Sequence, residues 1–194
     1  MEFPTQYTQG ITAVMLIGNA GAGKSTLLSL LGGDFPSGVT IILGYTTELK
    51  EQWITVNGER VLLMYIPGMY ESSNERIKHN ASQLTEAIRK GYNHKLYFAL
   101  KADNRGPQDP ELVMMAKVNE CVKRIDGSKV TFRIIFNQIH DDATYNMYRD
   151  ELAYDNFKSL FDTLPVKDLN KETVEVLVAK EAVTKVIADE IRLQ

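Results

Sequence analysis

The sequence predicts an α/β fold in which helices cover both faces of one mostly parallel, six-stranded sheet. Runs rich in β-branched and aromatic residues alternate with amphipathic stretches along most of the chain. Strands that alternate with helices favour a parallel sheet with three layers. One pair of runs is instead joined by Asn57 and Gly58, a strong signal for a two-residue hairpin. We therefore expect one antiparallel strand, at an edge of the sheet.

Six apolar runs have the length and composition of strands. The expected strands are Ile11 to Ile17, Thr47 to Val56, Arg60 to Ile66, Lys95 to Leu100, Val130 to Phe136 and Val174 to Val178. The expected helices show apolar residues at helical spacing. They are Ser25 to Leu31, Arg76 to Lys90, Pro110 to Ile125, Thr144 to Leu164 and Ala179 to Leu193. No linker or repeat interrupts this order, so we expect one domain over residues 1–194.

The composition narrows the class of protein. The 194 residues are 44% hydrophobic, which is enough for a sizeable core. A net charge of −3 without a basic run argues against nucleic acid as a partner. A single cysteine, Cys121, cannot form an internal disulfide and indicates either a reducing compartment or indifference to redox. No apolar run approaches the roughly 18 residues that span a bilayer. We therefore expect a cytoplasmic protein without a transmembrane segment.

The first strand runs directly into the motif G-x-x-x-x-G-K-[ST], and an apolar helix follows. This strand, loop and helix are the context of a phosphate-binding loop, or Walker A motif. Glycine at three positions allows successive N–H groups to point inward at an anion. Lys24 would neutralise the β- and γ-phosphates, facing solvent otherwise, and the Ser25 hydroxyl would ligate Mg²⁺. The expected nucleotide-binding residues are Gly18, Asn19, Ala20, Gly21, Ala22, Gly23, Lys24, Ser25 and Thr26.

The hairpin and four segments together resemble the G domains of translation-factor-related GTPases. The segments are Gly18 to Thr26, Phe35 to Thr40, Gly44 to Thr47 and Ile66 to Tyr70. They are most similar to the septin-like branch, which includes the immunity-associated and Toc-type GTPases. The resemblance extends from Ile11 to about His140. It implies a Ras-like G domain of the P-loop NTPase fold that binds GTP and Mg²⁺, hydrolyses GTP slowly to GDP, and acts as a switch or assembly module.

The resemblance also assigns residues to the γ-phosphate side of the site. It makes Asp34 to Thr46 the first switch. Thr46 would then ligate Mg²⁺ and position the attacking water, acting in catalysis with Lys24. Thr40 and Thr47 compete for that role, and Thr46 alternatively only begins an edge strand. Gly68 would contact the γ-phosphate through its amide, or else form a simple turn after the strand.

The base-binding motifs depart from the family pattern. Asn137 and Gln138 correspond to the start of the fourth motif, although Asn137 alternatively only begins a loop. His140 stands where the family has a guanine-reading carboxylate, unless a bulge brings in Asp141. In the fifth motif, Ala179 would contact the guanine carbonyl.

The third motif also departs, because Tyr65 replaces the aspartate that anchors Mg²⁺. Asp103 would supply that carboxylate, or else cap a helix or turn. Two alternatives therefore stay open: a non-catalytic nucleotide-binding interaction module, and an ATP-binding P-loop protein. The expected partners are a guanine nucleotide, a second copy bound through the nucleotide face, and an effector protein that the sequence does not identify. His79, His94 and His140 lack metal-ligand spacing and are expected in solvated or capping positions.

Overall fold

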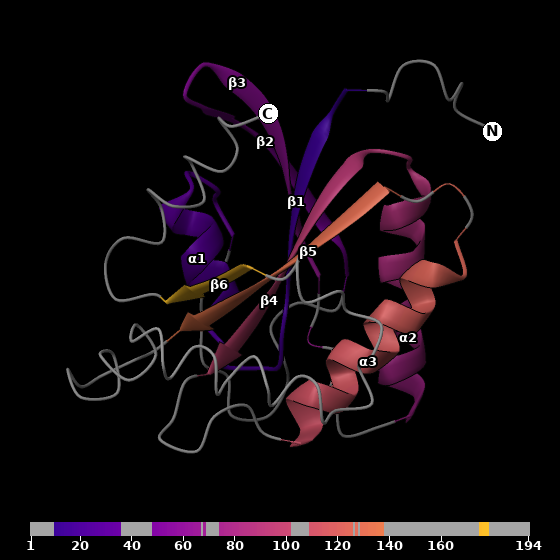
Figure 1. Ribbon diagram of the computed structural model, residues 1–194. Helices are drawn as coiled ribbons and strands as arrows, with labels where there is room; N and C mark the ends of the chain where they lie inside the picture. The colour runs from indigo at the N-terminus through magenta and orange to yellow at the C-terminus, as the bar shows by residue number, and fades with distance from the viewer. Residues whose placement is uncertain are drawn as a thin grey trace.

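A computed structural model describes residues 10–35, 48–66, 68, 74–101, 109–125, 127, 129–137 and 175–178. In this part of the chain, the strands form a single sheet with the order β2-β3-β1-β4-β5-β6 (Figure 1). The strands are β1 (Thr12–Ile17), β2 (Lys50–Val56), β3 (Glu59–Tyr65), β4 (Asn93–Lys101), β5 (Lys129–Asn137) and β6 (Glu175–Val178). Five of them form the body of the sheet, and β6 adds a short four-residue strand beside β5.

One pair of strands, β2 and β3, is antiparallel. It is joined by Asn57 and Gly58, whose φ angles of 54° and 89° lie in the left-handed region that this hairpin turn requires. All the other neighbours in the sheet are parallel. The structure thus confirms the α/β class and the antiparallel edge strand. Helices connect β3 to β4 and β4 to β5, so these strands can run in the same direction, whereas the tight turn at Asn57 and Gly58 makes β2 run antiparallel to β3.

Helices lie on both faces of the sheet. They are α1 (Lys24–Leu30), α2 (Asn74–Arg89) and α3 (Asp109–Lys123). The helices α2 and α3 cover one face, and α1 covers the other (Figure 1). Because successive strand residues point to opposite faces, β1 serves both cores. Met15 packs with α2 and α3, whereas Leu16 packs with α1.

The three described helices agree with the expected ones to within about two residues. The expected helices at 144–164 and 179–193 lie outside the described residues, and the organisation of 1–194 as one domain stays a prediction. Within the described part, no helix combines the length and apolar character needed to cross a membrane.

Candidate functional site: a phosphate-binding loop

The carboxyl ends of the parallel strands meet at one edge of the sheet. Leu16 of β1 pairs with Tyr65 of β3, and Lys101 of β4 pairs with Asn137 of β5. The loop that leaves β1 therefore lies between the ends of β3 and β4. Ligands of open α/β sheets bind outside this edge.

The backbone of the loop at residues 18–26 depends on its glycines. Gly21 and Gly23 both have φ of 81°, and Gly23 immediately precedes α1. A Cβ on Gly21 would meet nothing within 4 Å, so the loop is open there. A Cβ on Gly18 would lie 2.3 Å from the carbonyl oxygen of Ala99 on β4. Gly18 thus permits close packing against β4, while the other two give the loop its left-handed turns.

Lys24 lies inside the loop with only 5% of its surface exposed. Its Nζ donates to the carbonyl oxygens of Gly18 at 2.9 Å and Asn19 at 3.0 Å. The expectation that Lys24 faces solvent is therefore wrong. The loop curls so that its own carbonyl groups surround the ammonium, and these hydrogen bonds offset the cost of burying the charge.

The loop is also fastened to β5 by Asn137. The Asn137 side chain donates through Nδ2 to the carbonyl oxygen of Ala22 at 3.0 Å. Asn137 is the last residue of β5, so it does more than begin a loop. Beside this contact, the Oδ1 atom of Asn19 is buried and has no hydrogen-bond partner among the described residues. The structure thus brings one residue of the expected base-binding motif directly to the phosphate loop.

Tyr65 lies beside the loop at the end of β3. The Lys24 Nζ atom is 5.9 Å from the centroid of the Tyr65 ring, and Phe35 stacks on the same ring at 5.9 Å with an interplanar angle of 23°. A phenol ring attracts a cation through its face but offers no carboxylate to a metal. An aromatic pair therefore stands where the resemblance implies a metal-anchoring acid.

Gly68 is held by a residue that the sequence did not indicate. The side chain of Asn80, on α2, donates through Nδ2 to the Gly68 carbonyl oxygen at 2.5 Å. Asn80 is only 4% exposed. A single polar residue on the inner face of an amphipathic helix gives no recognisable motif. Only its place on the buried, apolar face of α2, opposite the polar exposed face, could have drawn attention to it.

The remaining expected site residues divide into two groups. Ser25 is half-buried at the start of α1, and Thr26 next to it is exposed. Thr46, Gln138 and Ala179 lie outside the described residues. So do the alternatives Thr40, Thr47, Asp103, His140 and Asp141. Within the described ranges, no group of three or more His, Cys, Asp or Glu residues is arranged to hold a metal ion.

Comparison with known proteins assigns the part of the chain that contains this loop to a protein family. Residues 13–137 match a protein family described as 50S ribosome-binding GTPase. The chain belongs to this GTPase family. The match begins in β1 and ends at Asn137, so it contains the glycine loop, Tyr65 and Gly68. A search of curated proteins gives no significant match.

Solved structures of GTP-binding proteins share the fold. A GTP-binding protein from Sulfolobus solfataricus in complex with GDP has a TM-score of 0.57 at 16% identity, covering 97% of this chain and 53% of that one. Era with MgGDPNP and 16S ribosomal RNA has a TM-score of 0.61 at 15% identity, covering 94% and 56%. Toc33 from Arabidopsis thaliana has a TM-score of 0.57 at 13% identity, covering 90% and 72%. This chain thus spans about half the length of the first two. The likeness supports a three-layer α/β G-domain fold.

Proposed function

We propose that this protein binds GTP and GDP together with Mg²⁺ and hydrolyses GTP slowly, acting as a nucleotide-dependent switch or assembly module. The observation that carries the proposal is the buried Lys24 ammonium inside a glycine loop that opens at the carboxyl edge of the sheet. Membership of a GTPase family and the nucleotide-bound structures that share the fold support it.

Nucleotide binding would change the hydrogen-bond acceptors of the Lys24 ammonium. The Lys24 ammonium is held by two loop carbonyls, and phosphate oxygens would replace them as stronger, charged acceptors. The left-handed φ angles of Gly21 and Gly23 support a loop whose successive N–H groups would point at the same anion. The half-buried Ser25 hydroxyl fits a Mg²⁺ ligand. When bound, Mg²⁺ would neutralise charge that develops on the phosphates.

Hydrolysis would depend on few protein groups. We assign Thr46 to positioning the attacking water, the Gly68 N–H to the γ-phosphate, and Lys24 to stabilising charge in the transition state. None of these groups is a strong base, which is consistent with slow turnover. A second copy meeting this one through the nucleotide face would supply a further catalytic group, as in the septin-like branch, where we place the chain.

The second candidate is a non-catalytic nucleotide-binding module, and Tyr65 favours it. The aromatic pair of Tyr65 and Phe35 occupies the end of β3 without offering a carboxylate. Such a protein would bind nucleotide and change its contacts with an effector without turnover. An ATP-binding protein is the third candidate, because the fourth motif lacks its usual carboxylate at His140. In each case we expect a cytoplasmic protein.

One sequence of measurements separates these candidates. Chromatography of the nucleotide released from purified protein identifies the bound base. Phosphate release from GTP and from ATP then measures turnover. We expect guanine nucleotide in the protein and slow release from GTP. Bound nucleotide without any phosphate release would favour the non-catalytic module, adenine nucleotide would favour the ATP-binding protein, and no binding at all would contradict the proposal.

A further inference from the structure

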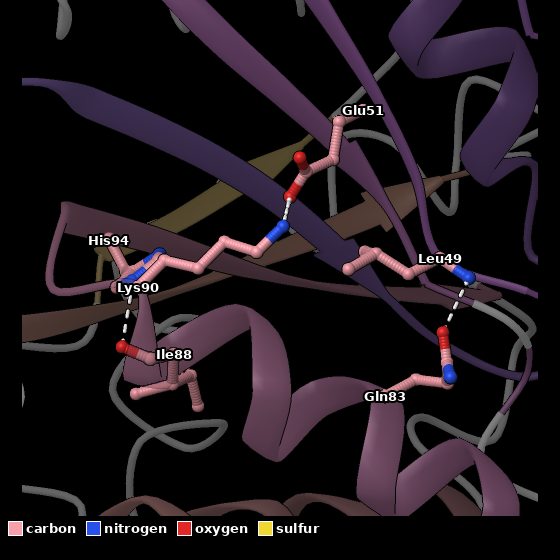
Figure 2. A network of polar contacts seen from close by, with 6 residues as sticks. All are labelled: Leu49, Glu51, Gln83, Ile88, Lys90 and His94. Carbon is pink, nitrogen blue, oxygen red and sulfur yellow. Dashed lines mark hydrogen bonds and ion pairs between the residues drawn. The ribbon is translucent and has the colours of Figure 1, made fainter. Parts of the chain in front are cut away.

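Helix α2 is attached to the sheet by contacts that do not involve Asn80. Leu84, Ala87 and Ile88 are buried in the core beneath it. Figure 2 shows two polar attachments as well: the backbone N–H of Leu49 donates to Gln83 at 2.9 Å, and Lys90 pairs with Glu51 at 2.6 Å. The helix therefore has enough anchors to stay in place when Asn80 is changed.

Asn80 makes a different kind of contact. Its side chain donates to the Gly68 carbonyl, twelve residues earlier in the chain. A buried amide without a partner destabilises a protein, so this hydrogen bond is the feature that makes a polar residue tolerable at a 4% exposed position. Gly68 has no side chain to restrict its backbone, and a fixed carbonyl limits the conformations of the peptide around it.

We propose that Asn80 is a positioning residue for γ-phosphate recognition. By holding the Gly68 carbonyl, it fixes the orientation in which the Gly68 N–H meets the γ-phosphate, and it links that contact to α2. The inference rests on the proposed function, which assigns the Gly68 N–H to the γ-phosphate. A donor that is fixed before the ligand arrives binds more tightly, because less conformational freedom is lost on binding.

A role for Asn80 at the γ-phosphate predicts different effects on the binding of nucleoside triphosphates and diphosphates. The loop at residues 18–26 would hold the phosphates common to GDP and GTP, and no described contact joins Asn80 to that loop. Loss of Asn80 should therefore weaken binding of a triphosphate and leave binding of a diphosphate unchanged. A residue that merely stabilises the fold would affect both nucleotides alike.

The test compares the affinities of fluorescent GDP and fluorescent GDPNP for the full chain with Mg²⁺. The variant Asn80→Ala removes the donor, and Asn80→Asp keeps the shape of the side chain while replacing the donor by an acceptor. We expect both to lower the GDPNP affinity relative to GDP by about five- to tenfold, the effect of one hydrogen bond. Thr85→Val is the matched control, because it removes a hydrogen bond from Thr85 to Ala81 within the same helix and touches no loop.

Each result decides the matter. An unchanged GDPNP-to-GDP ratio in Asn80→Ala would overturn the role of Asn80, and so would an equal change of the ratio in Thr85→Val. Wild-type protein that binds neither nucleotide would overturn the proposed function itself, which is a distinguishable failure. If Asn80→Ala does not fold, Asn80→Ser supplies the same ratio, since its shorter side chain keeps a polar group at the position without reaching Gly68.

Discussion

Lys24 and His94 are basic residues buried at opposite ends of the sheet, and they are buried in different ways. Lys24 follows the carboxyl end of β1, where carbonyl groups of the loop surround its ammonium. His94 lies near the amino end of β4, opposite Ala13 of β1. Its Nε2 contacts the Ile88 carbonyl at 3.3 Å (Figure 2), and its Nδ1 is buried without a hydrogen-bond partner among the described residues.

The difference lies in what each environment does to the charge. Around Lys24, several acceptors stabilise the ammonium, and an anionic ligand could take their place. Around His94, burial lowers the pKa from 6.5 to about 4, although the Ile88 hydrogen bond raises it and nearby Lys90 lowers it further. His94 is therefore neutral at pH 7 and is buried rather than solvated, whereas its contact with the Ile88 carbonyl, in the last turn of α2, agrees with the capping position that was the other expectation. Under the proposed function one end of the sheet receives an anion, whereas the other end is packed in the apolar core.

The largest effect is expected from a substitution of Lys24 at the polar end of the sheet, which is the edge where the carboxyl ends of the parallel strands meet. Lys24→Ala removes the fixed cation from the loop, so we expect affinity for a fluorescent GTP analogue to fall at least a hundredfold, about 3 kcal/mol or more, beyond the loss of a single charged hydrogen bond. The variant should also be less stable, by about 1 kcal/mol, because two carbonyl groups lose their donor. Lys90→Ala is the matched control, since Lys90 is a half-buried lysine away from the loop. Unchanged affinity in Lys24→Ala would refute the assignment of the phosphate loop.

A second variant tests whether the part of the site expected to bind the guanine base is as incomplete as its sequence indicates. Without a carboxylate for the guanine ring N–H groups, discrimination between GTP and ATP should be weak. Restoring the fourth motif by Gln138→Lys with His140→Asp should widen the GTP-to-ATP affinity ratio by about ten- to a hundredfold, equivalent to roughly 1.5–3 kcal/mol. Titration of both nucleotides against both proteins measures it. A wild-type ratio already beyond about a thousandfold would mean that another group, such as Asp141, reads the base.

The burial of His94 at the opposite, apolar end of the sheet predicts how the stability of the protein depends on pH. The unfolded chain binds a proton at His94 below pH 6.5, whereas the folded chain binds it only near pH 4. Stability from this group is therefore present above pH 6.5 and is lost as the pH falls toward 4. Between pH 7 and pH 5 the loss is about 2 kcal/mol. Denaturant unfolding of wild type and His94→Gln at both pH values isolates the contribution of His94. If the free energy of unfolding changed equally between pH 7 and pH 5 in the two proteins, the prediction would be contradicted.

Much of this arrangement could be predicted from the sequence, for reasons that the same residues illustrate. The strand and helix periods, the Asn57-Gly58 turn and the glycine loop are local signals, and each forms the element expected. The inward position of Lys24 was not predictable, because it depends on how the loop carbonyls curl. The burial of His94 and of Asn80 was not predicted, because the burial of a single polar residue is set by neighbours far away in the sequence.

The smallest effect concerns Tyr65, which adjoins the polar end without adding charge to it. Tyr65→Asp would place a carboxylate, a ligand type that Mg²⁺ prefers, at the position where the resemblance implies that the metal is anchored. We expect nucleotide binding to become more dependent on Mg²⁺, with a half-saturating concentration about three- to tenfold lower, and phosphate release to become faster. One well-placed ligand or hydrogen bond to a charged group accounts for an effect of that size.

The change also removes the ring that stacks on Phe35, and this second effect must be separated from the first. Tyr65→Phe is the control, because it keeps the stacked ring and lacks both the hydroxyl and the acid. If the missing carboxylate limits the site, only Tyr65→Asp should accelerate single-turnover phosphate release at saturating Mg²⁺. Equal rates in wild type, Tyr65→Phe and Tyr65→Asp would show that the metal site is not impaired by Tyr65. The slow turnover would then have to arise from the groups that position water, and the polar end of the sheet would be complete without an acid at the end of β3.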